Sequence, residues 1–128
     1  MLSILQISKA DTICYWHVYH NDELLKQFSE VSKNPEIQIL LNIEYPDSLT
    51  TKFYKDTPCQ DCQVTLLIQD DKGRVVQQIK NKGTAVPLTV DLLTMSKFNV
   101  KANNNYLHFY YFEKDERLKI LLFKLKIY

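Results

Sequence analysis

Apolar and polar residues alternate along most of this chain, and a hydrophobic period of two predicts β-strands. The alternating stretches are rich in β-branched and aromatic residues, which strands favour. They span residues 12–19, 36–45, 63–69, 74–80, 86–92, 106–112 and 118–128. Pro46 ends the second strand, because proline cannot donate a hydrogen bond to a sheet. Pro87 indicates, for the same reason, an edge position or a kink in the strand over 86–92.

Turn-forming residues separate the predicted strands. The sequence DDKG at 70–73 has early aspartates and a final glycine, which suits a type I turn whose last residue takes positive φ. The two strands beside it are therefore predicted to form a hairpin. Further turns or loops are predicted at NKG, NNN and EKDER, residues 81–83, 103–105 and 113–117. The last of these joins the final two strands into a long terminal hairpin.

The segment NDELLKQFSEV, residues 21–31, fits two structures. Its apolar residues Leu24, Leu25, Phe28 and Val31 have helical spacing. Asn21 or Asp22 would cap such a helix, so a short helix near 22–32 is one alternative. The same residues also suit the returning arm of a hairpin after a tight HND turn. The hairpin is slightly favoured, because the preceding strand leads directly into it.

Eight or more short strands spaced by turns predict an all-β fold, an antiparallel β-sandwich of the Ig-like or jelly-roll-like kind. Antiparallel pairing is expected because most connections are too short for parallel crossovers. A length of 128 residues fits a single domain, so one sandwich over residues 1–128 is expected. The Cys…Trp…Cys spacing of immunoglobulin domains is absent from the sequence, since Cys14 and Trp16 are nearly adjacent.

The carboxy-terminal strands carry large apolar side chains on both faces. A strand with one solvated face should alternate apolar with polar residues, so something is expected to cover the second face. The cover is a helix or loop of the same chain, another subunit, or a carbohydrate stacked on exposed tyrosines. Alternating lysines in the last strand are typical of a guarded edge or face. The residues predicted to make interactions are Tyr106, Phe109, Tyr110, Tyr111, Phe112, Lys124 and Lys126.

Charge and composition exclude several kinds of partner. The net charge of +1 provides no global field that would attract nucleic acid or an anionic membrane. Only Arg74 and Arg117 are arginines, the residue that phosphate and guanine recognition prefers, so no nucleic-acid partner is predicted. The only glycines, Gly73 and Gly83, are too few for a phosphate-cradling loop. No apolar stretch approaches about 18 residues, so no membrane span is predicted.

Cys59 and Cys62 in TPCQDCQ have the spacing of a metal knuckle or a redox dithiol. A structural zinc site needs four ligands, and Cys14, His17 and His20 would have to complete it. On a strand, His17 points away from Cys14 and His20, so no metal is predicted. A redox dithiol needs a helix N-terminus, and this pair precedes a strand. A tight turn with Cys62 partly buried is favoured, and a local disulfide stays open.

The sequence offers no recognisable catalytic set, so no enzyme activity and no cofactor are predicted. A Cys59 nucleophile would need His108 beside it in space, and no local signature favours that pairing. Asp70 and Asp71 are turn formers. The acidic residues Glu113, Asp115 and Glu116 fall in a predicted loop, where solvation explains their charges.

These observations favour a non-enzymatic structural or assembly protein that acts through sheet faces and edges. Its expected partners are protein subunits, in a homo- or hetero-oligomer, for instance in the head, connector or tail of a phage virion. The alternative is a carbohydrate- or protein-binding β-sandwich module with tyrosine anchors. No signal peptide is recognisable in MLSILQISKADT, so a cytoplasmic protein, or one assembled into a virion in the cytoplasm, is expected.

Overall fold

The computed structural model of the chain describes residues 14–40, 47–99, 106–114 and 119–127. Nine strands and one helix form in these segments. They are β1 (Tyr15–His20), β2 (Glu23–Ser29), β3 (Glu36–Ile39), β4 (Ser48–Tyr54), β5 (Gln63–Gln69), β6 (Val75–Lys82), β7 (Leu88–Asp91), α2 (Leu92–Asn99), β8 (Leu107–Glu113) and β9 (Ile120–Ile127). Among the described helices and strands, none is a helix long and apolar enough to cross a membrane.

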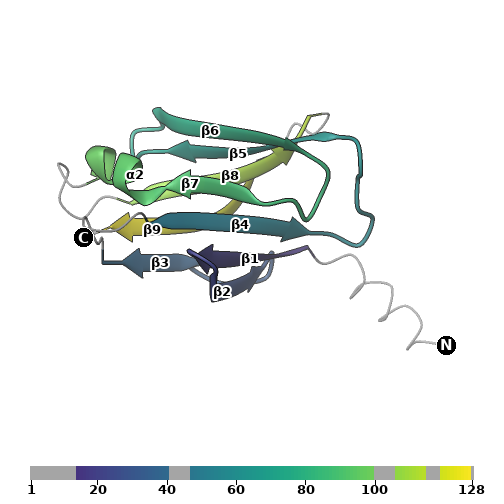
Figure 1. Cartoon of the computed structure of the whole chain (residues 1–128), viewed down its shortest axis with the longest axis horizontal. Helices are drawn as coiled ribbons and strands as arrows, with labels where there is room; N and C mark the ends of the chain where they lie inside the picture. Colours follow the sequence, from purple (N-terminus) through teal and green to yellow (C-terminus); the bar gives the residue numbers. More distant parts are fainter. Residues whose placement is uncertain (1–13, 41–46, 100–105, 115–118, 128) are drawn as a thin grey trace.

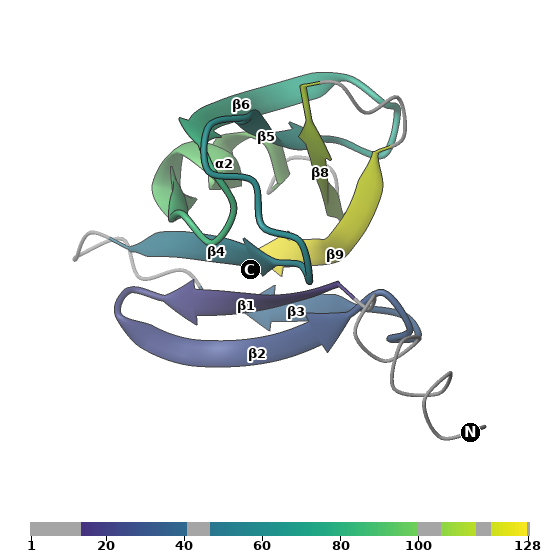
Figure 2. The same ribbon diagram turned by 90° about the vertical axis from the view of Figure 1, so that its right-hand side faces the viewer.

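The strands form two packed sheets, which confirms the predicted all-β sandwich (Figure 1). One sheet has the order β2-β1-β4-β7 and the other has the order β3-β9-β8-β5-β6. Figure 2 shows β2 at the outer margin of the molecule, beyond β1. All pairs are antiparallel except β3 and β9, which run parallel. Antiparallel pairing was therefore predicted correctly for every described pair but this one.

Aromatic rings from both sheets stack through the core. Phe53 of β4 lies between Trp16 of β1 and Tyr111 of β8, with ring centroids 5.9 Å and 4.0 Å apart. The indole nitrogen of Trp16 also donates a hydrogen bond of 3.0 Å to the carbonyl oxygen of Leu122 in β9. All four residues are buried. This arrangement joins the two sheets by packing and by a directional polar contact.

The predicted hairpin at 63–80 is confirmed as β5 and β6. Gly73 ends the turn with a φ of 80°, and its amide donates to the Asp70 carbonyl at 3.0 Å. The Asp70 carboxylate accepts from the amides of Lys72 and Arg74, each at 2.9 Å. Those donors, the Arg74 amide first, hold the pKa of Asp70 below its ordinary value. The terminal hairpin is also confirmed, since β8 pairs antiparallel with β9.

The alternative of a helix near 22–32 is wrong, because residues 23–29 form strand β2 and the favoured hairpin is confirmed. Asn21 takes a φ of 57° in the connecting turn. The Asn21 side-chain oxygen accepts the Ser48 amide at 3.0 Å, and its nitrogen donates to Asp47 at 3.2 Å. Long-range pairing, with Trp16 opposite Phe28, therefore outweighs the helical spacing of the leucines.

Two elements were not predicted from the sequence. Strand β4 (Ser48–Tyr54) lies between β1 and β7, and helix α2 (Leu92–Asn99) follows β7 at one end of the sandwich (Figure 1). Asp91 caps the helix, because its carboxylate accepts the Leu93 amide at 3.2 Å and the Thr94 hydroxyl at 3.0 Å. The strand predicted over 86–92 is confirmed only for β7 (Leu88–Asp91). β7 lies at the edge of its sheet, which agrees with the edge position predicted from Pro87.

Several predicted segments fall outside the described residues. These are residues 12–13 and 41–45 of two strands, the NNN loop at 103–105, residues 115–117 of the EKDER loop, and residues 118 and 128 of the last strand. Glu113, which was predicted to be a solvated charge in a loop, lies within the described part, and that prediction is wrong. Glu113 ends β8 and is buried.

Candidate interaction site

The structure divides the residues that were predicted to make interactions. Phe109 and Tyr111 point between the sheets and are fully buried, because they share a face with Ile68 and Leu66 of β5. These two residues are therefore not candidates for a surface contact, since a partner could reach them only if the core opened. Tyr106, Tyr110 and Phe112 are half-buried on the opposite side of β8, as are Lys124 and Lys126 on β9.

Neighbouring side chains partly cover this outer face of the five-stranded sheet. The Lys119 ammonium lies 4.7 Å from the ring centre of Tyr110, and that of Lys124 lies 5.7 Å from Tyr106. Leu67 on the same face is buried. Burial likewise lowers the pKa of His108 below its ordinary value, although Asp71, 3.7 Å away, acts in the opposite direction. The lysine stems thus shield part of the apolar surface.

A second aromatic surface lies on the outer face of the four-stranded sheet. Trp16 and Val18 of β1 point into the core, so Tyr15, His17 and Tyr19 point outward. Tyr54 of β4 lies beside them. Its ring stacks on Tyr15 at 5.0 Å, and its centroid is 5.0 Å from that of His17. We call Tyr15, His17, Tyr19 and Tyr54 the aromatic face.

Burial and a neighbouring lysine affect two tyrosines of the aromatic face. Burial raises the pKa of the Tyr54 hydroxyl above its ordinary value, and Tyr19 and Tyr15 add to the effect. The Tyr54 hydroxyl therefore keeps its proton to a higher pH than an ordinary tyrosine does. The ammonium group of Lys52 lies 5.2 Å from the ring centre of Tyr19, within the range of a cation–π contact.

Exposed apolar side chains continue from the aromatic face onto β2. Seven large hydrophobic residues are exposed in the described part of the chain, and four belong to β1, β2 or the turn after β2. These four are Tyr15, Leu24, Leu25 and Val31. β2 is also the terminal strand of its sheet. Among the described strands, an unpaired edge of β2 therefore lies beside an apolar surface, a combination that favours contact with another polypeptide.

A shallow groove borders the aromatic face at Tyr19. Its volume is about 320 Å³. The lining consists of one aromatic ring and mainly polar side chains: Tyr19, Asn21, Asp22, Thr50, Lys52, Pro87 and Thr89. The hydroxyl groups of Thr50 and Thr89 form a hydrogen bond of 2.8 Å across β4 and β7. This groove can offer an aromatic ring together with several polar groups to a ligand.

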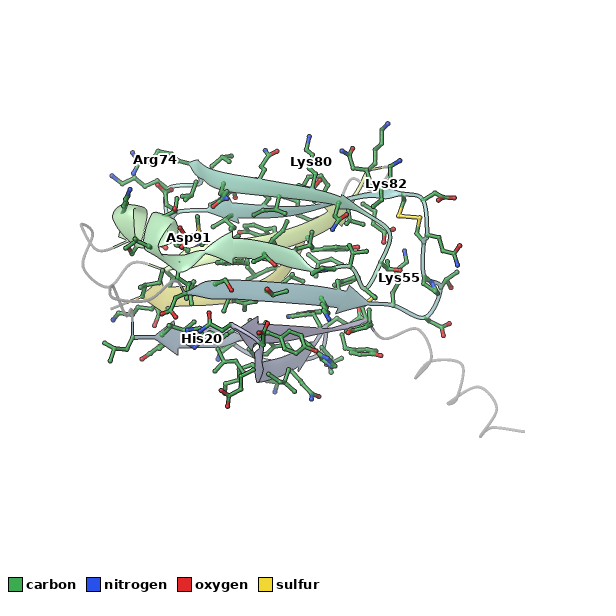
Figure 3. The ribbon with its side chains drawn as sticks, in the orientation of Figure 1. His20, Lys55, Arg74, Lys80, Lys82 and Asp91 are labelled. Atoms are coloured by element: carbon green, nitrogen blue, oxygen red, sulfur yellow. A yellow bond between two sulfur atoms is a disulfide. The ribbon has the colours of Figure 1, made fainter. Side chains whose placement is uncertain are left out.

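The histidines of β1 point in different directions, as the sequence predicted for a strand. His17 belongs to the aromatic face. His20, labelled in Figure 3, has its Nε2 atom 3.4 Å from Asp47 Oδ1. Cys14 packs partly against the core. Among the described residues, no group of three or more His, Cys, Asp or Glu side chains is placed to bind a metal ion.

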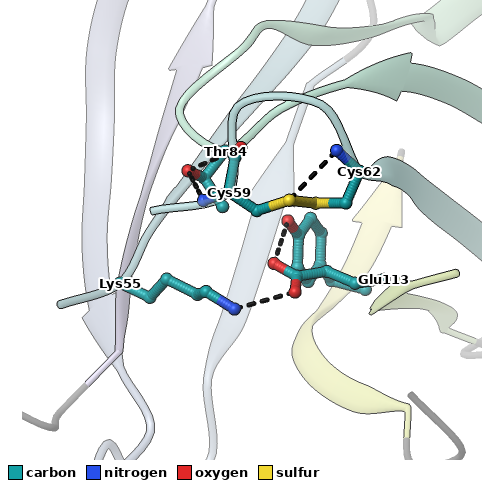
Figure 4. Close-up of polar contacts among 6 residues, drawn as sticks. Lys55, Cys59, Cys62, Thr84 and Glu113 are labelled. Atoms are coloured by element: carbon teal, nitrogen blue, oxygen red, sulfur yellow. Dashed lines mark hydrogen bonds and ion pairs between the residues drawn. A yellow bond between two sulfur atoms is a disulfide. The ribbon is translucent and has the colours of Figure 1, made fainter. Parts of the chain in front are cut away.

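Cys59 and Cys62 form a disulfide within a tight turn before β5 (Figure 4). Cys62 is partly buried, as the favoured interpretation predicted. The turn is held to the segment after β6, because the Thr84 amide donates to the Cys59 carbonyl at 2.8 Å and the Gly83 amide donates to Cys62 at 2.9 Å. Gly83 has a φ of 88°, and a side chain there would meet the Gln60 carbonyl oxygen at 3.0 Å. The glycine is thus required by a close backbone approach.

The Cys59–His108 pair considered from the sequence does not form. The disulfide precedes the first residue of β5, whereas His108 pairs with Gln69, the last residue of that strand. Near the disulfide lies an ion pair instead: Lys55 Nζ is 2.7 Å from Glu113 Oε1 (Figure 4). The Tyr111 hydroxyl donates to the other Glu113 oxygen at 3.4 Å.

Comparison with models of known protein families and with curated protein sequences found no match. The candidate site therefore rests on geometry. The sequence contained one signal for it, since the alternation in YWHVYH separates Tyr15, His17 and Tyr19 from Trp16 and Val18. Tyr54 was missed because β4 was missed.

Proposed function

We propose that this chain is a non-enzymatic structural protein that joins a larger protein assembly through a sheet face and a sheet edge. The surface that we assign to this contact is the aromatic face together with strand β2. The observation that carries the proposal is the gathering of exposed apolar side chains on and beside an edge strand. A virion component, such as a phage head, connector or tail protein, is the proposed setting, because lysine far outnumbers arginine and no catalytic motif is recognisable in the sequence.

The aromatic face is suited to protein contacts for a physical reason. Tyrosine provides a large contact area with few rotatable bonds, and stacking between Tyr15 and Tyr54 already restricts both rings. Little side-chain entropy is then lost on binding. Tyrosine is also enriched among the residues that dominate binding energy at interfaces.

The partner that suits β2 best is a second copy of this chain. Two identical edge strands can pair around a two-fold axis, which gives a closed and self-complementary contact. Leu24 and Leu25 on β2, both exposed in the single chain, would be buried by such pairing. Burying one leucine side chain contributes about 1.5–3 kcal/mol.

Sedimentation velocity over a range of concentrations tests this proposal. We expect the unmodified chain to self-associate, and Leu24→Lys to raise the dissociation constant by about tenfold or more. Lysine on an edge strand is a common means of preventing strand pairing. Leu93→Lys is the matched control, because Leu93 on α2 is 45% exposed and Leu24 is 44% exposed. A chain that stays monomeric at every concentration would contradict the proposal, as would equal effects of the two substitutions.

Carbohydrate binding is the second candidate, and the groove beside Tyr19 favours it. An aromatic ring can stack on the apolar face of a sugar, while Asn21, Asp22 and Thr89 are placed along the groove to meet hydroxyl groups. We expect Tyr19→Ala to abolish any glycan-array signal, and Tyr110→Ala, on the other sheet, to retain it. Absence of signal from the unmodified protein, or loss of signal in both variants, would rule out this candidate.

A further inference from the structure

A second groove lies at the far end of the five-stranded sheet, on the other sheet from the aromatic face. Its volume is about 550 Å³. The residues that line it are Asp61, Cys62, Gln63, Lys80, Asn81, Lys82 and Lys114. Among the described residues, three lysines and one aspartate make this lining positive, although the whole chain has a net charge of only +1. We call it the lysine groove.

The strand register explains why these lysines gather. Thr65 of β5 pairs with Lys80 on one side and with Phe112 on the other, so these side chains share the outer face. Gln63, two residues earlier, pairs with Lys82 and accepts the amide of Lys114 at 2.9 Å. The three lysines thus converge from β6 and from the residue after β8. Figure 3 shows Lys80 and Lys82 projecting outward from β6.

In the described part of the chain, the ammonium groups of this groove form no ion pair, and Asp61 is the one carboxylate in the described lining. No ion pair between described residues involves Lys80, Lys82 or Lys114. The nearby carboxylate of Glu113 is already occupied by Lys55. Like charges around one concave surface repel one another, and an incoming anion would relieve that repulsion.

We infer that the lysine groove binds an acidic segment of a partner protein. Carboxylates complement the three ammonium groups, and the side-chain amide of Gln63 can hydrogen-bond a peptide backbone. The Asn81 amide is already engaged, since it donates to the Pro87 carbonyl at 3.1 Å and accepts the Lys82 amide at 2.8 Å. The described lining of the groove contains no arginine, the residue that phosphate recognition prefers. An acidic peptide therefore fits the lining better than a nucleic acid does. This inference goes beyond the proposed assembly contact, because it concerns a different sheet and different residues.

Fluorescence anisotropy with a labelled polyglutamate peptide tests the inference. We expect the unmodified protein to bind the peptide, with an affinity that falls as salt is added. The triple variant Lys80→Gln, Lys82→Gln and Lys114→Gln should bind about tenfold more weakly, because each exposed ion pair contributes about two- to threefold. A matched control replaces three exposed lysines elsewhere, Lys26, Lys33 and Lys97, by glutamine. Both triple variants remove three positive charges, so a difference in their peptide affinity must come from where the lysines lie.

Each other outcome overturns the inference. No binding of the peptide, or equal weakening in the two triple variants, would show that the groove is not a specific site. Tighter binding of a single-stranded oligonucleotide of equal charge would assign the groove to nucleic acid instead. If inorganic phosphate displaced the labelled peptide at the same concentration as unlabelled peptide does, the groove would be a site for small anions. Thermal unfolding of both triple variants checks that the fold is retained. None of these peptide-binding outcomes affects the result of the self-association test with Leu24→Lys.

Discussion

Replacing Trp16 by alanine is expected to destabilise the fold by about 3–5 kcal/mol, the cost of removing a large buried aromatic side chain. Trp16 is buried between the sheets and stacks on Phe53. Since a domain of this size is stabilised by only about 5–15 kcal/mol, the variant should lose a large fraction of its stability. Urea denaturation followed by circular dichroism measures the change.

The more conservative change Trp16→Phe isolates the polar part of this contact. A register shift in the β8–β9 pair leaves Leu122 without a residue opposite it, and the Trp16 indole nitrogen donates to its carbonyl. Phenylalanine would leave that buried oxygen without this donor, at a cost of about 1–3 kcal/mol. Tyr15→Ala, one position away on the outer face, should cost less than about 1 kcal/mol. If Trp16→Ala cost no more than Tyr15→Ala, the packing described between the sheets would be wrong.

The second large effect is expected from Lys55→Met, which removes the cation beside Glu113. The Glu113 side chain is nearly buried, whereas that of Lys55 is 22% exposed. A carboxylate left without its partner inside the fold is costly, and the partial exposure of Lys55 reduces the loss to about 1–3 kcal/mol. Urea denaturation at neutral pH measures it.

A double-mutant cycle with Glu113→Gln separates the pair from its surroundings. If the ion pair accounts for the loss, Lys55→Met should cost much less in the Glu113→Gln background than in the unmodified chain. Arg74→Met is the control, because Arg74 also pairs with a carboxylate, that of Asp70, but is 72% exposed, and little change is expected there. Additive effects of Lys55→Met and Glu113→Gln would show that the two side chains do not interact energetically.

Local signals in the sequence predicted much of the fold. The hairpin of β5 and β6 follows from a turn whose residues fix its own backbone, and β8 and β9 follow from alternation around a short connection. β4 was missed because its inward side chains include Thr51, so the alternation in SLTTKFY is weak. Helix α2 was missed because the alternation of β7 continues to Leu92, which hid the capping role of Asp91.

The candidate sites could be predicted only in part. Alternation assigns Phe109 and Tyr111 to one face of β8 and Tyr110 to the other, but both faces are apolar, so the sequence does not indicate which one enters the core. The aromatic face needs Tyr15 and Tyr54 together, and these meet only through the pairing of β1 with β4. The lysine groove depends in the same way on the register of β5 with its two neighbours.

The parallel pairing of β3 with β9 sets the order in which this chain can fold during synthesis. Ile37 must pair with Leu125, which the ribosome adds much later, after every other strand has been made. β3 therefore cannot pair with β9 until late in synthesis, when all four strands of the β2-β1-β4-β7 sheet have already been made. Because such distant contacts are made only after a large loss of chain entropy, we expect refolding on the millisecond-to-second timescale typical of β-sandwiches.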